Sequence, residues 1–267
     1  MNLLVYPLGM LYVARLKWAL FYLIALFLFI FVDVFLLLDI DISLIWLVIF
    51  LISTIHAYLI ASGSAACCKR PRYSRWYGLT LIYLAFLLMA LGLRTFVYDI
   101  FRVPFTSMVP TIPYGSVLAV SKWGYGNYRL FDFEVMTADF SKQLSRGDVI
   151  VFAYPKDPSL SYVKRVVGLP GDHIAYFYKK LYINKRAVKN VLVEHIDEYD
   201  LYEEYIDGKK HFIVNMSQQS SATDGEFEVP EDQYFVLGDN RGDSSDSRDW
   251  GFVPQENIVG KVVKIFH

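Results

Sequence analysis

Cysteine is almost absent from this chain, which limits how the protein can be stabilised. Its 267 residues include two cysteines, Cys67 and Cys68, which are adjacent and lie beside a basic run. Two adjacent cysteines cannot provide a disulfide framework, so the remainder of the chain must be stabilised by its core. Cysteines next to a membrane span are also sites of lipidation, although two unmodified thiols are the simpler interpretation.

An excess of positive charge is lacking as well. The chain has 26 Lys and Arg against 27 Asp and Glu, so it lacks the basic footprint of a nucleic-acid-binding protein. Apolar residues, in contrast, make up 55% of the chain, which is high for a soluble domain. Because this excess is concentrated near the N-terminus, we predict a membrane region at residues 1–97 and a water-exposed domain at 98–267.

Three apolar runs in the first region are long enough to cross a membrane. The runs cover residues 18–38, 42–61 and 77–97. A bilayer core of about 30 Å requires about 20 helical residues. The ionisable residues Asp33, His56 and Arg94 lie near the ends of the runs, and we assign them structural roles. The first run is too long for the apolar segment of a cleaved signal peptide, and residues 1–14 remain unassigned.

Charges in the loops predict the orientation of these spans. Arg15 and Lys17 precede the first run, acidic residues link the first and second, and four basic residues link the second and third. Basic loops stay in the cytoplasm. The sequence therefore predicts a multi-pass protein of the inner (cytoplasmic) membrane, with residues 98–267 on the extracytoplasmic, periplasmic side.

No long amphipathic helical pattern occurs in residues 98–267. Short runs of β-branched and aromatic residues alternate there with turn signals. The predicted strands are residues 116–121, 148–152, 162–167, 173–177, 180–183, 233–237 and 259–265. We expect three N-terminal transmembrane helices followed by a mostly antiparallel β domain, in which residues 197–226 form the most irregular segment.

Ser107 and Lys164 are candidates for nucleophilic chemistry. A serine needs a nearby base, and no histidine of this chain accompanies a G-x-S-x-G motif. A lysine can act as the base if burial lowers its pKa from about 10.4. Valines flank Lys164 on a predicted strand. Spacing alone nevertheless favours an exposed strand lysine, so both alternatives remain open at this point.

Three separated blocks decide between these alternatives. Ser-Met-x-Pro-Thr stands at 107–111, and Arg-Gly-Asp-Val at 146–149 precedes Tyr-Val-Lys-Arg-Val-Val-Gly-Leu-Pro-Gly-Asp at 162–172. Gly-Asp-Asn-Arg at 238–241 precedes Ser244, Asp246-Ser-Arg248 and Trp-Gly-Phe-Val-Pro at 250–254. In this order, the blocks resemble the type I signal peptidases, membrane serine proteases with a Ser–Lys dyad.

The resemblance implies a role for each matching residue. Ser107 would be the nucleophile that forms the acyl-enzyme, with Lys164 as its general base. Ser244 would orient the lysine, and Asp246 and Arg248 would form a supporting pair. The resemblance implies neither a metal nor a cofactor.

The resemblance also implies an extended substrate, bound between residues 102–104 and 161–163. The predicted substrate-binding residues are Val103, Pro104, Met108, Ile112, Tyr162 and Val163, which would line shallow pockets for a small-x-small motif. The implied partners are signal peptides of preproteins, membrane lipid and, indirectly, the protein translocation machinery.

Phe105 departs from the pattern of many relatives, which have a serine there that helps to form the oxyanion hole. Phenylalanine cannot donate a hydrogen bond, so the backbone N–H of Ser107 is the remaining candidate donor. Thr106 could supply a hydroxyl, but adjacent residues on an extended chain point to opposite sides. Phe105 could instead narrow a substrate pocket.

The sequence thus predicts a membrane-bound serine endopeptidase that removes N-terminal signal peptides. Two alternatives remain. One is a dedicated peptidase of a conjugation or pilin export system, because the third span and Phe105 depart from the commonest pattern. The other is a membrane protein with a non-catalytic, receptor-like β domain.

Overall fold

The protein is described by a computed structural model in which the chain forms two compact units. The units are Met1–Ala90 and Leu91–His267. The described residues are 10–11, 15–22, 24–25, 42–63, 75–130, 133–197, 199–216 and 224–266.

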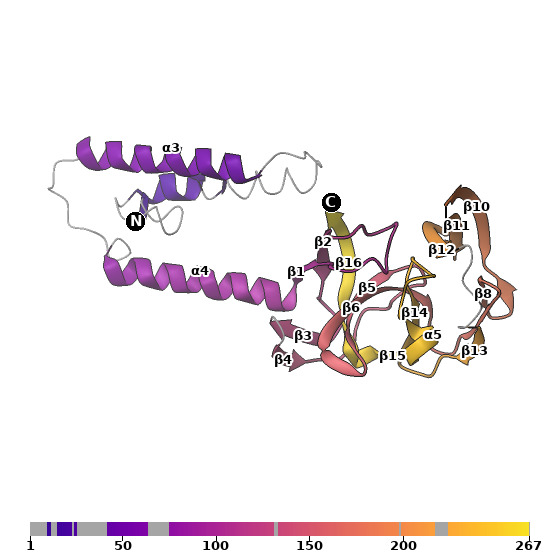
Figure 1. The fold of residues 1–267 in the computed structure, drawn as a ribbon. Helices are drawn as coiled ribbons and strands as arrows, with labels where there is room; N and C mark the ends of the chain where they lie inside the picture. The colour runs from indigo at the N-terminus through magenta and orange to yellow at the C-terminus, as the bar shows by residue number, and fades with distance from the viewer. Residues whose placement is uncertain are drawn as a thin grey trace. The chain divides into compact units, whose positions relative to one another are not determined.

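The described residues of the first unit are mainly helical. Residues 16–22 are helical, and they are followed along the chain by α3 (Ile42–Gly63) and by α4 (Trp76–Phe96), which continues into the second unit (Figure 1). A small core joins these segments with residues 10 and 11, and its members are Met10, Leu11, Ala19, Tyr22, Ala57 and Leu79. A 2.9 Å hydrogen bond connects the Tyr22 hydroxyl with Nδ1 of His56, so the polar side chain of His56 has a partner within this unit.

One helix in the described residues is long and apolar enough, by length and composition, to cross a membrane. It covers Tyr77–Phe96, has a mean hydropathy of 1.9 and lies within the predicted run 77–97. The predicted run 42–61 lies in α3, where Leu51–Ser62 forms a shorter apolar segment. Most of the run 18–38, together with Asp33 and the two cysteines, lies outside the described residues, and the three spans stay a prediction.

The second unit is built around a seven-stranded sheet, as expected for a mostly antiparallel β domain (Figure 1). In spatial order its strands are β1 (Tyr98–Arg102), β2 (Val117–Ser121), β16 (Ile258–Phe266), β5 (Val149–Tyr154), β6 (Asp157–Gly168), β14 (Gln233–Leu237) and β15 (Val253–Pro254). Every neighbouring pair in this sheet is antiparallel.

Three smaller sheets complete the domain. A four-stranded sheet has the order β13 (Gly225–Glu228), β7 (His173–Phe177), β8 (Lys180–Ile183), β9 (Arg186–Ala187). A three-stranded sheet contains β10 (Lys189–Ile196), β11 (Tyr199–Ile206) and β12 (Lys209–Met216), and β3 (Asn127–Leu130) pairs with β4 (Phe133–Thr137). The β10–β12 sheet lies at the end of the domain opposite β1 (Figure 1).

All seven predicted strands are present, but the prediction of an irregular segment at 197–226 is wrong. Most of that segment forms the antiparallel hairpin of β11 and β12. Asp207 and Gly208 turn the chain with φ values of 47° and 77°. Asp-Gly with both residues at positive φ is a favoured two-residue hairpin turn, so the signal was present in the sequence.

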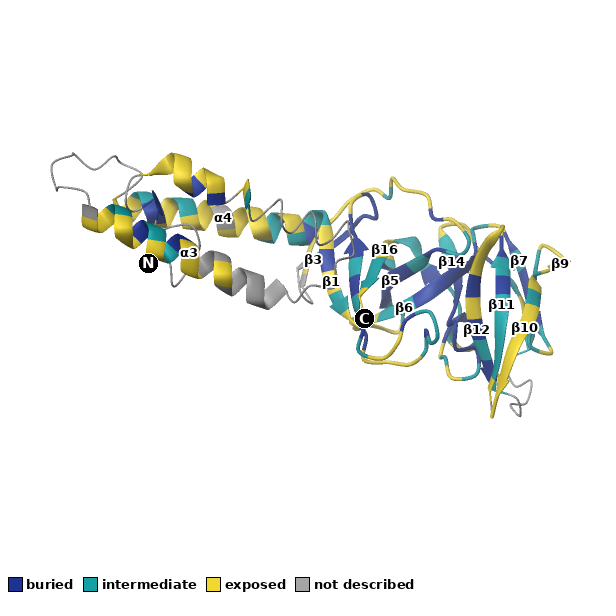
Figure 2. Ribbon diagram, turned by 90° about the horizontal axis from the view of Figure 1, so that it is seen from above, coloured by how far each residue is buried: buried dark blue, intermediate teal, exposed yellow. Residues whose placement is uncertain are grey.

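Apolar residues fill both faces of the large sheet. Ile150 and Phe152 of β5 belong to one buried cluster, whereas Val151 between them belongs to another. Such alternation places successive side chains on opposite faces, and both faces are covered. Most residues of β5 and β14 are therefore buried (Figure 2). Strand β6 differs, because it is exposed at its start and buried from Lys164 onward.

Candidate active site

Lys164 lies where β6 enters the core. It is opposite Ile150 of β5 in the strand pairing, and 3% of its surface is exposed. Its Nζ is 5.8 Å from the centroid of the Tyr162 ring, as expected for residues two positions apart on one strand face. The alternative of an exposed strand lysine is therefore wrong.

Ser107 lies in the turn that follows β1, the edge strand of the large sheet. Its Oγ accepts a hydrogen bond of 2.6 Å from Nζ of Lys164, although the two residues are 57 positions apart in the chain. The fold thus brings the predicted nucleophile and base into contact.

The surroundings of Lys164 change its acidity. Burial lowers the pKa of the Lys164 ammonium to about 8, because the charged form loses its hydration. The carboxylates of Asp246 and Asp239 oppose this effect, and the guanidinium of Arg248 adds to it. With this pKa, roughly a tenth of the amine is neutral at pH 7 and about half at pH 8, and the neutral form is able to accept a proton from a serine.

Asp246 and Arg248 form the ion pair implied at the site. Oδ1 and Oδ2 of Asp246 accept hydrogen bonds of 2.8 and 2.9 Å from Nε and Nη2 of Arg248. Asp246 is fully buried and caps the short helix α5 (Ser247–Trp250). It also accepts a 3.0 Å hydrogen bond from the backbone N–H of Gly238, which follows β14. Asp246 therefore holds together the two ends of the loop of residues 238–246.

Ser244 does not form the hydrogen bond to Lys164 that the resemblance implies. Its Oγ is buried and has no hydrogen-bond partner among the described residues. Ser244 instead packs against Gly238, where an added Cβ would lie 2.1 Å from Ser244 Oγ and 2.6 Å from the backbone oxygen of Ser107. The same oxygen accepts a 3.1 Å hydrogen bond from the backbone N–H of Asn240. Glycine at 238 thus allows the loop to approach the backbone of Ser107 closely.

A cavity of about 320 Å³ opens at the Ser107–Lys164 pair. It is lined by Pro104, Phe105, Thr106, Ser107, Tyr114, Tyr162, Val163, Lys164, Asp243 and Ser245. Of the predicted substrate-binding residues, three are in this lining. The structure places the other three, Val103, Met108 and Ile112, in the core beneath the cavity, where at most 5% of each is exposed. These three residues belong to one buried apolar cluster that also contains Leu118 and Val120 of β2.

Comparison with known proteins identifies the family. Residues 75–267 match the family described as "Signal peptidase, peptidase S26". The chain belongs to this family. It is 39% identical over 197 residues to signal peptidase I of Pseudomonas fluorescens, covering 67% of this chain and 68% of that protein. Signal peptidase I of Rickettsia typhi is 38% identical over 193 residues, covering 65% and 73%.

A solved structure of signal peptidase I from Enterococcus faecalis V583 is also similar to this chain. The two are 28% identical, with 46% of this chain and 98% of that chain covered, and the TM-score is 0.31. The assignment of this peptidase to its family accordingly rests on sequence.

Sequence reasoning missed three residues of the peptidase cavity: Tyr114, Asp243 and Ser245. Asp243 is notable because its Oδ2 accepts a 3.2 Å hydrogen bond from the hydroxyl of Thr106, which was considered as an oxyanion donor. Within the described residues, the backbone N–H of Ser107 donates no hydrogen bond and remains the candidate donor. Among those residues, no group of three His, Cys, Asp or Glu side chains is arranged to hold a metal ion.

Phe105 lines the cavity and leaves 59% of its surface exposed, so its ring limits the space beside Ser107. We expect Phe105→Ala to favour larger side chains at the two small positions of a small-x-small motif. Cleavage of a substrate with valine at such a position should rise by about tenfold relative to a substrate with alanine, since apolar pockets discriminate a single methylene group by about 10–200-fold. The ratio of kcat/KM for two such preproteins measures this effect. Tyr178→Ala removes an exposed ring outside the cavity lining and serves as the control. An unchanged ratio in the Phe105 variant would contradict the prediction.

Proposed function

We propose that this protein is a membrane-bound serine endopeptidase that removes N-terminal signal peptides from exported preproteins. The proposal rests above all on the 2.6 Å contact between Lys164 Nζ and Ser107 Oγ, made by a lysine that burial brings toward the neutral form. The substrate class is supported by the relatives named signal peptidase I.

The geometry supports acyl transfer with Lys164 as the base. Neutral Lys164 accepts the proton of Ser107 as Oγ attacks the carbonyl carbon at the end of the signal peptide. The tetrahedral intermediate collapses to an acyl-enzyme, and the lysine gives its proton to the leaving amine of the mature protein. Lys164 then takes a proton from the water that attacks the ester carbonyl and gives that proton to Ser107 Oγ as the C–O bond breaks, which releases the signal peptide and regenerates both residues. The backbone N–H of Ser107 is the candidate donor to the oxyanion.

The substrate binds in this proposal as an added strand. Strand β14 pairs with Arg165, Val166 and Gly168 of β6. In the described part of the chain, the stretch of β6 before Arg165 therefore has β5 on one edge and no strand on the other. Tyr162 and Val163 of that stretch line the cavity together with Pro104. An extended peptide can pair with this edge, while small side chains of a small-x-small motif enter the cavity.

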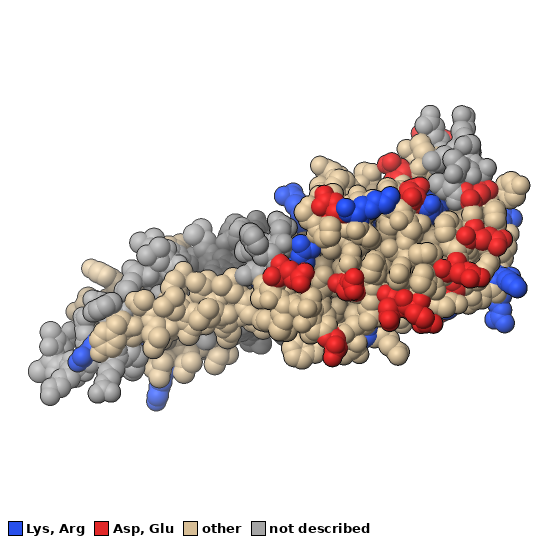
Figure 3. Space-filling view, turned by 90° about the horizontal axis from the view of Figure 1, so that it is seen from below, with Lys and Arg blue, Asp and Glu red and all other residues tan. Residues whose placement is uncertain are grey.

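Membrane attachment is the remaining part of the proposal. Along α4, Leu81 and Leu88 expose 69% and 68% of their surfaces, as expected for side chains that face lipid. On the face shown in Figure 3, charged side chains are concentrated on the β domain, and Arg94 is the one charged residue in the sequence of α4. We propose three spans in residues 1–97, with the peptidase domain outside the cytoplasm, where signal peptides emerge beside the translocation machinery.

The test is cleavage of a preprotein by the detergent-solubilised full-length protein between about pH 6 and pH 10. Because the neutral lysine is the active form, we expect kcat/KM to rise with pH and to level off above the Lys164 pKa of about 8. Sequencing the N-terminus of the product locates the cleaved bond. A rate that stays constant across this range would contradict a lysine base, and failure to release a signal peptide would contradict the function.

A further inference from the structure

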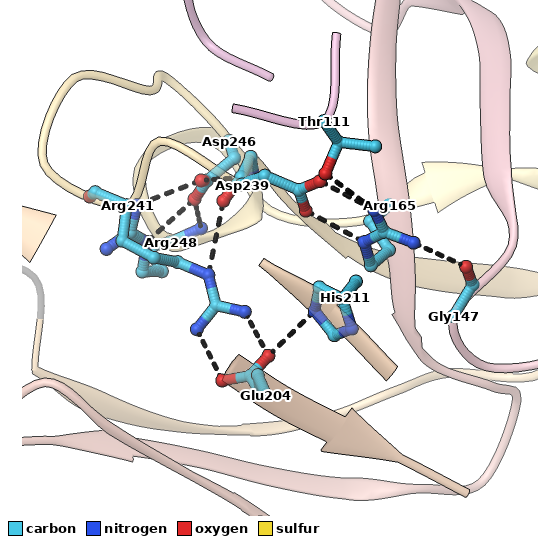
Figure 4. Close-up of polar contacts among 10 residues, drawn as sticks. Thr111, Gly147, Arg165, Glu204, His211, Asp239, Arg241, Asp246 and Arg248 are labelled. Atoms are coloured by element: carbon cyan, nitrogen blue, oxygen red, sulfur yellow. Dashed lines mark hydrogen bonds and ion pairs between the residues drawn. The ribbon is translucent and has the colours of Figure 1, made fainter. Parts of the chain in front are cut away.

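A buried ionic cluster that takes no part in the proposed chemistry lies behind the loop of residues 238–246 (Figure 4). Nη1 of Arg241 is 3.1 Å from Oε1 of Glu204, and Nη2 contacts Oε2. His211 Nε2 lies 3.1 Å from Oε2 of the same carboxylate. Glu204 and Arg241 are 1% and 3% exposed, so both charges are removed from water.

Glu204 remains ionised in this position. Burial raises the pKa of its carboxyl, but the charge of Arg241 and the hydrogen bonds from His211 and Arg241 outweigh that effect and bring the pKa to about 2. The charge of Glu204 is therefore constant over the pH range in which the peptidase works.

The cluster joins two distant parts of the chain. Glu204 belongs to β11 and His211 to β12 in the three-stranded sheet, whereas Arg241 belongs to the loop. The backbone makes the same connection, because Val214 N–H donates to the oxygen of Asp239 at 2.9 Å and Arg241 N–H donates to the oxygen of Val214 at 2.8 Å. Side chains and backbone together hold the loop against the β11–β12 hairpin.

Further hydrogen bonds connect Arg241 with the residues that surround Ser107 and Lys164. Its Nε donates to the oxygen of Gly238 at 3.1 Å, and its own backbone oxygen accepts from Arg248 at 2.9 Å. The neighbouring Asn240 donates its backbone N–H to the oxygen of Ser107. The charged groups around Lys164, namely Asp239, Asp243, Asp246 and Arg248, all lie on or beside this loop.

We infer that Glu204 is a positioning residue of the peptidase, which fixes the loop through Arg241 and so keeps Ser107 and Lys164 in reactive geometry. The inference rests on the proposed function. A buried ion pair is weak evidence for stability, since apolar residues of similar volume often replace it without loss. The two contacts between the Glu204 carboxylate and the Arg241 guanidinium, however, restrict the position of Arg241 more than an apolar contact would.

The inference is tested by the pH dependence of kcat/KM in the full-length protein with a preprotein substrate. In Glu204→Gln, a loosened loop admits water to Lys164 and raises its pKa. We therefore expect a loss of about tenfold or more near pH 8 and a smaller loss near pH 10, with the midpoint moved upward. The matched control is Glu203→Gln, on the same strand, whose side chain pairs with the exposed Lys210 and is expected to leave the profile unchanged.

Glu204→Gln leaves Arg241 as a buried charge without its partner, which can lower stability by itself. The double variant Glu204→Met/Arg241→Met separates the two effects, because it removes both charges and keeps the volume. We expect it to unfold near the wild-type temperature and still show the reduced kcat/KM and the raised midpoint.

Two results would overturn the inference: wild-type kcat/KM in the double variant, or a Glu204→Gln profile equal to that of Glu203→Gln. A wild-type protein without Ser107-dependent cleavage would instead overturn the proposed function itself, and the inference with it.

Discussion

Ser107→Ala is expected to lower kcat for preprotein cleavage by about 10⁴-fold or more, because it removes the oxygen that forms the acyl-enzyme. Lys164→Met should cause a loss of similar size. Methionine fills nearly the volume of the lysine stem at this buried position but cannot accept the proton of Ser107. Both variants keep the packing of the site, so both should unfold near the wild-type temperature.

The two substitutions are expected to be far from additive. Residues that act as one unit lose nearly the whole effect with the first substitution, so the double variant should be about as slow as either single variant. Single-turnover cleavage in detergent measures all three rates. Ser116→Ala is the control, since Ser116 is a buried serine outside the cavity lining and its Oγ has no hydrogen-bond partner among the described residues. Substantial cleavage by either single variant would exclude the dyad.

Gly238→Ala is expected to lower kcat/KM by about 10²-fold, the size of effect that follows from displacing a reacting group by about 1 Å. The added Cβ would lie 2.6 Å from the backbone oxygen of Ser107 and 2.5 Å from Cβ of Ser244, so the loop or the nucleophile must move. Overpacking of this kind also costs about 1–3 kcal/mol of stability.

The control for this variant is Gly92→Ala, because a Cβ added at Gly92 has no atom within 4 Å. Its activity should equal that of the wild type. Activity assays at a temperature where both variants are folded separate the displaced nucleophile from loss of stability. Equal kcat/KM for the two variants would show that the loop can absorb the extra methyl group without moving Ser107.

How much of the fold and the site could be predicted depended on whether a feature is fixed by neighbouring residues or by contacts between distant parts of the chain. Short runs of β-branched and aromatic residues between turn signals predicted strands such as His173–Phe177 with the bounds found in the structure. The β11–β12 hairpin was missed because charged residues such as Glu203 and Lys210 obscure its alternation, although its Asp-Gly turn was visible.

Prediction of the candidate site was also limited by contacts that local sequence patterns do not show. Spacing alone argued against Lys164, because part of its surroundings comes from residues distant in sequence, such as Ser107 and Asp246. Three family blocks were needed to select it. No local pattern could show that Met108 and Ile112 face the core rather than the cavity, since both are apolar residues in a turn. The Glu204–Arg241 pair, 37 residues apart, was equally inaccessible.

The open edge of β6 also exposes the peptidase to unwanted pairing with other chains, since unpaired strand edges promote aggregation. The start of this strand is blocked: Pro158 has no N–H, its carbonyl accepts a 2.8 Å hydrogen bond from Arg129, and the N–H of Ser159 donates to the side chain of Asp157. What remains available is a short stretch that ends at the nucleophile's partner, Lys164. So short an edge offers few backbone hydrogen bonds to a strand of another folded protein, which reduces the risk of aggregation while leaving room for the extended peptide of the proposed binding mode.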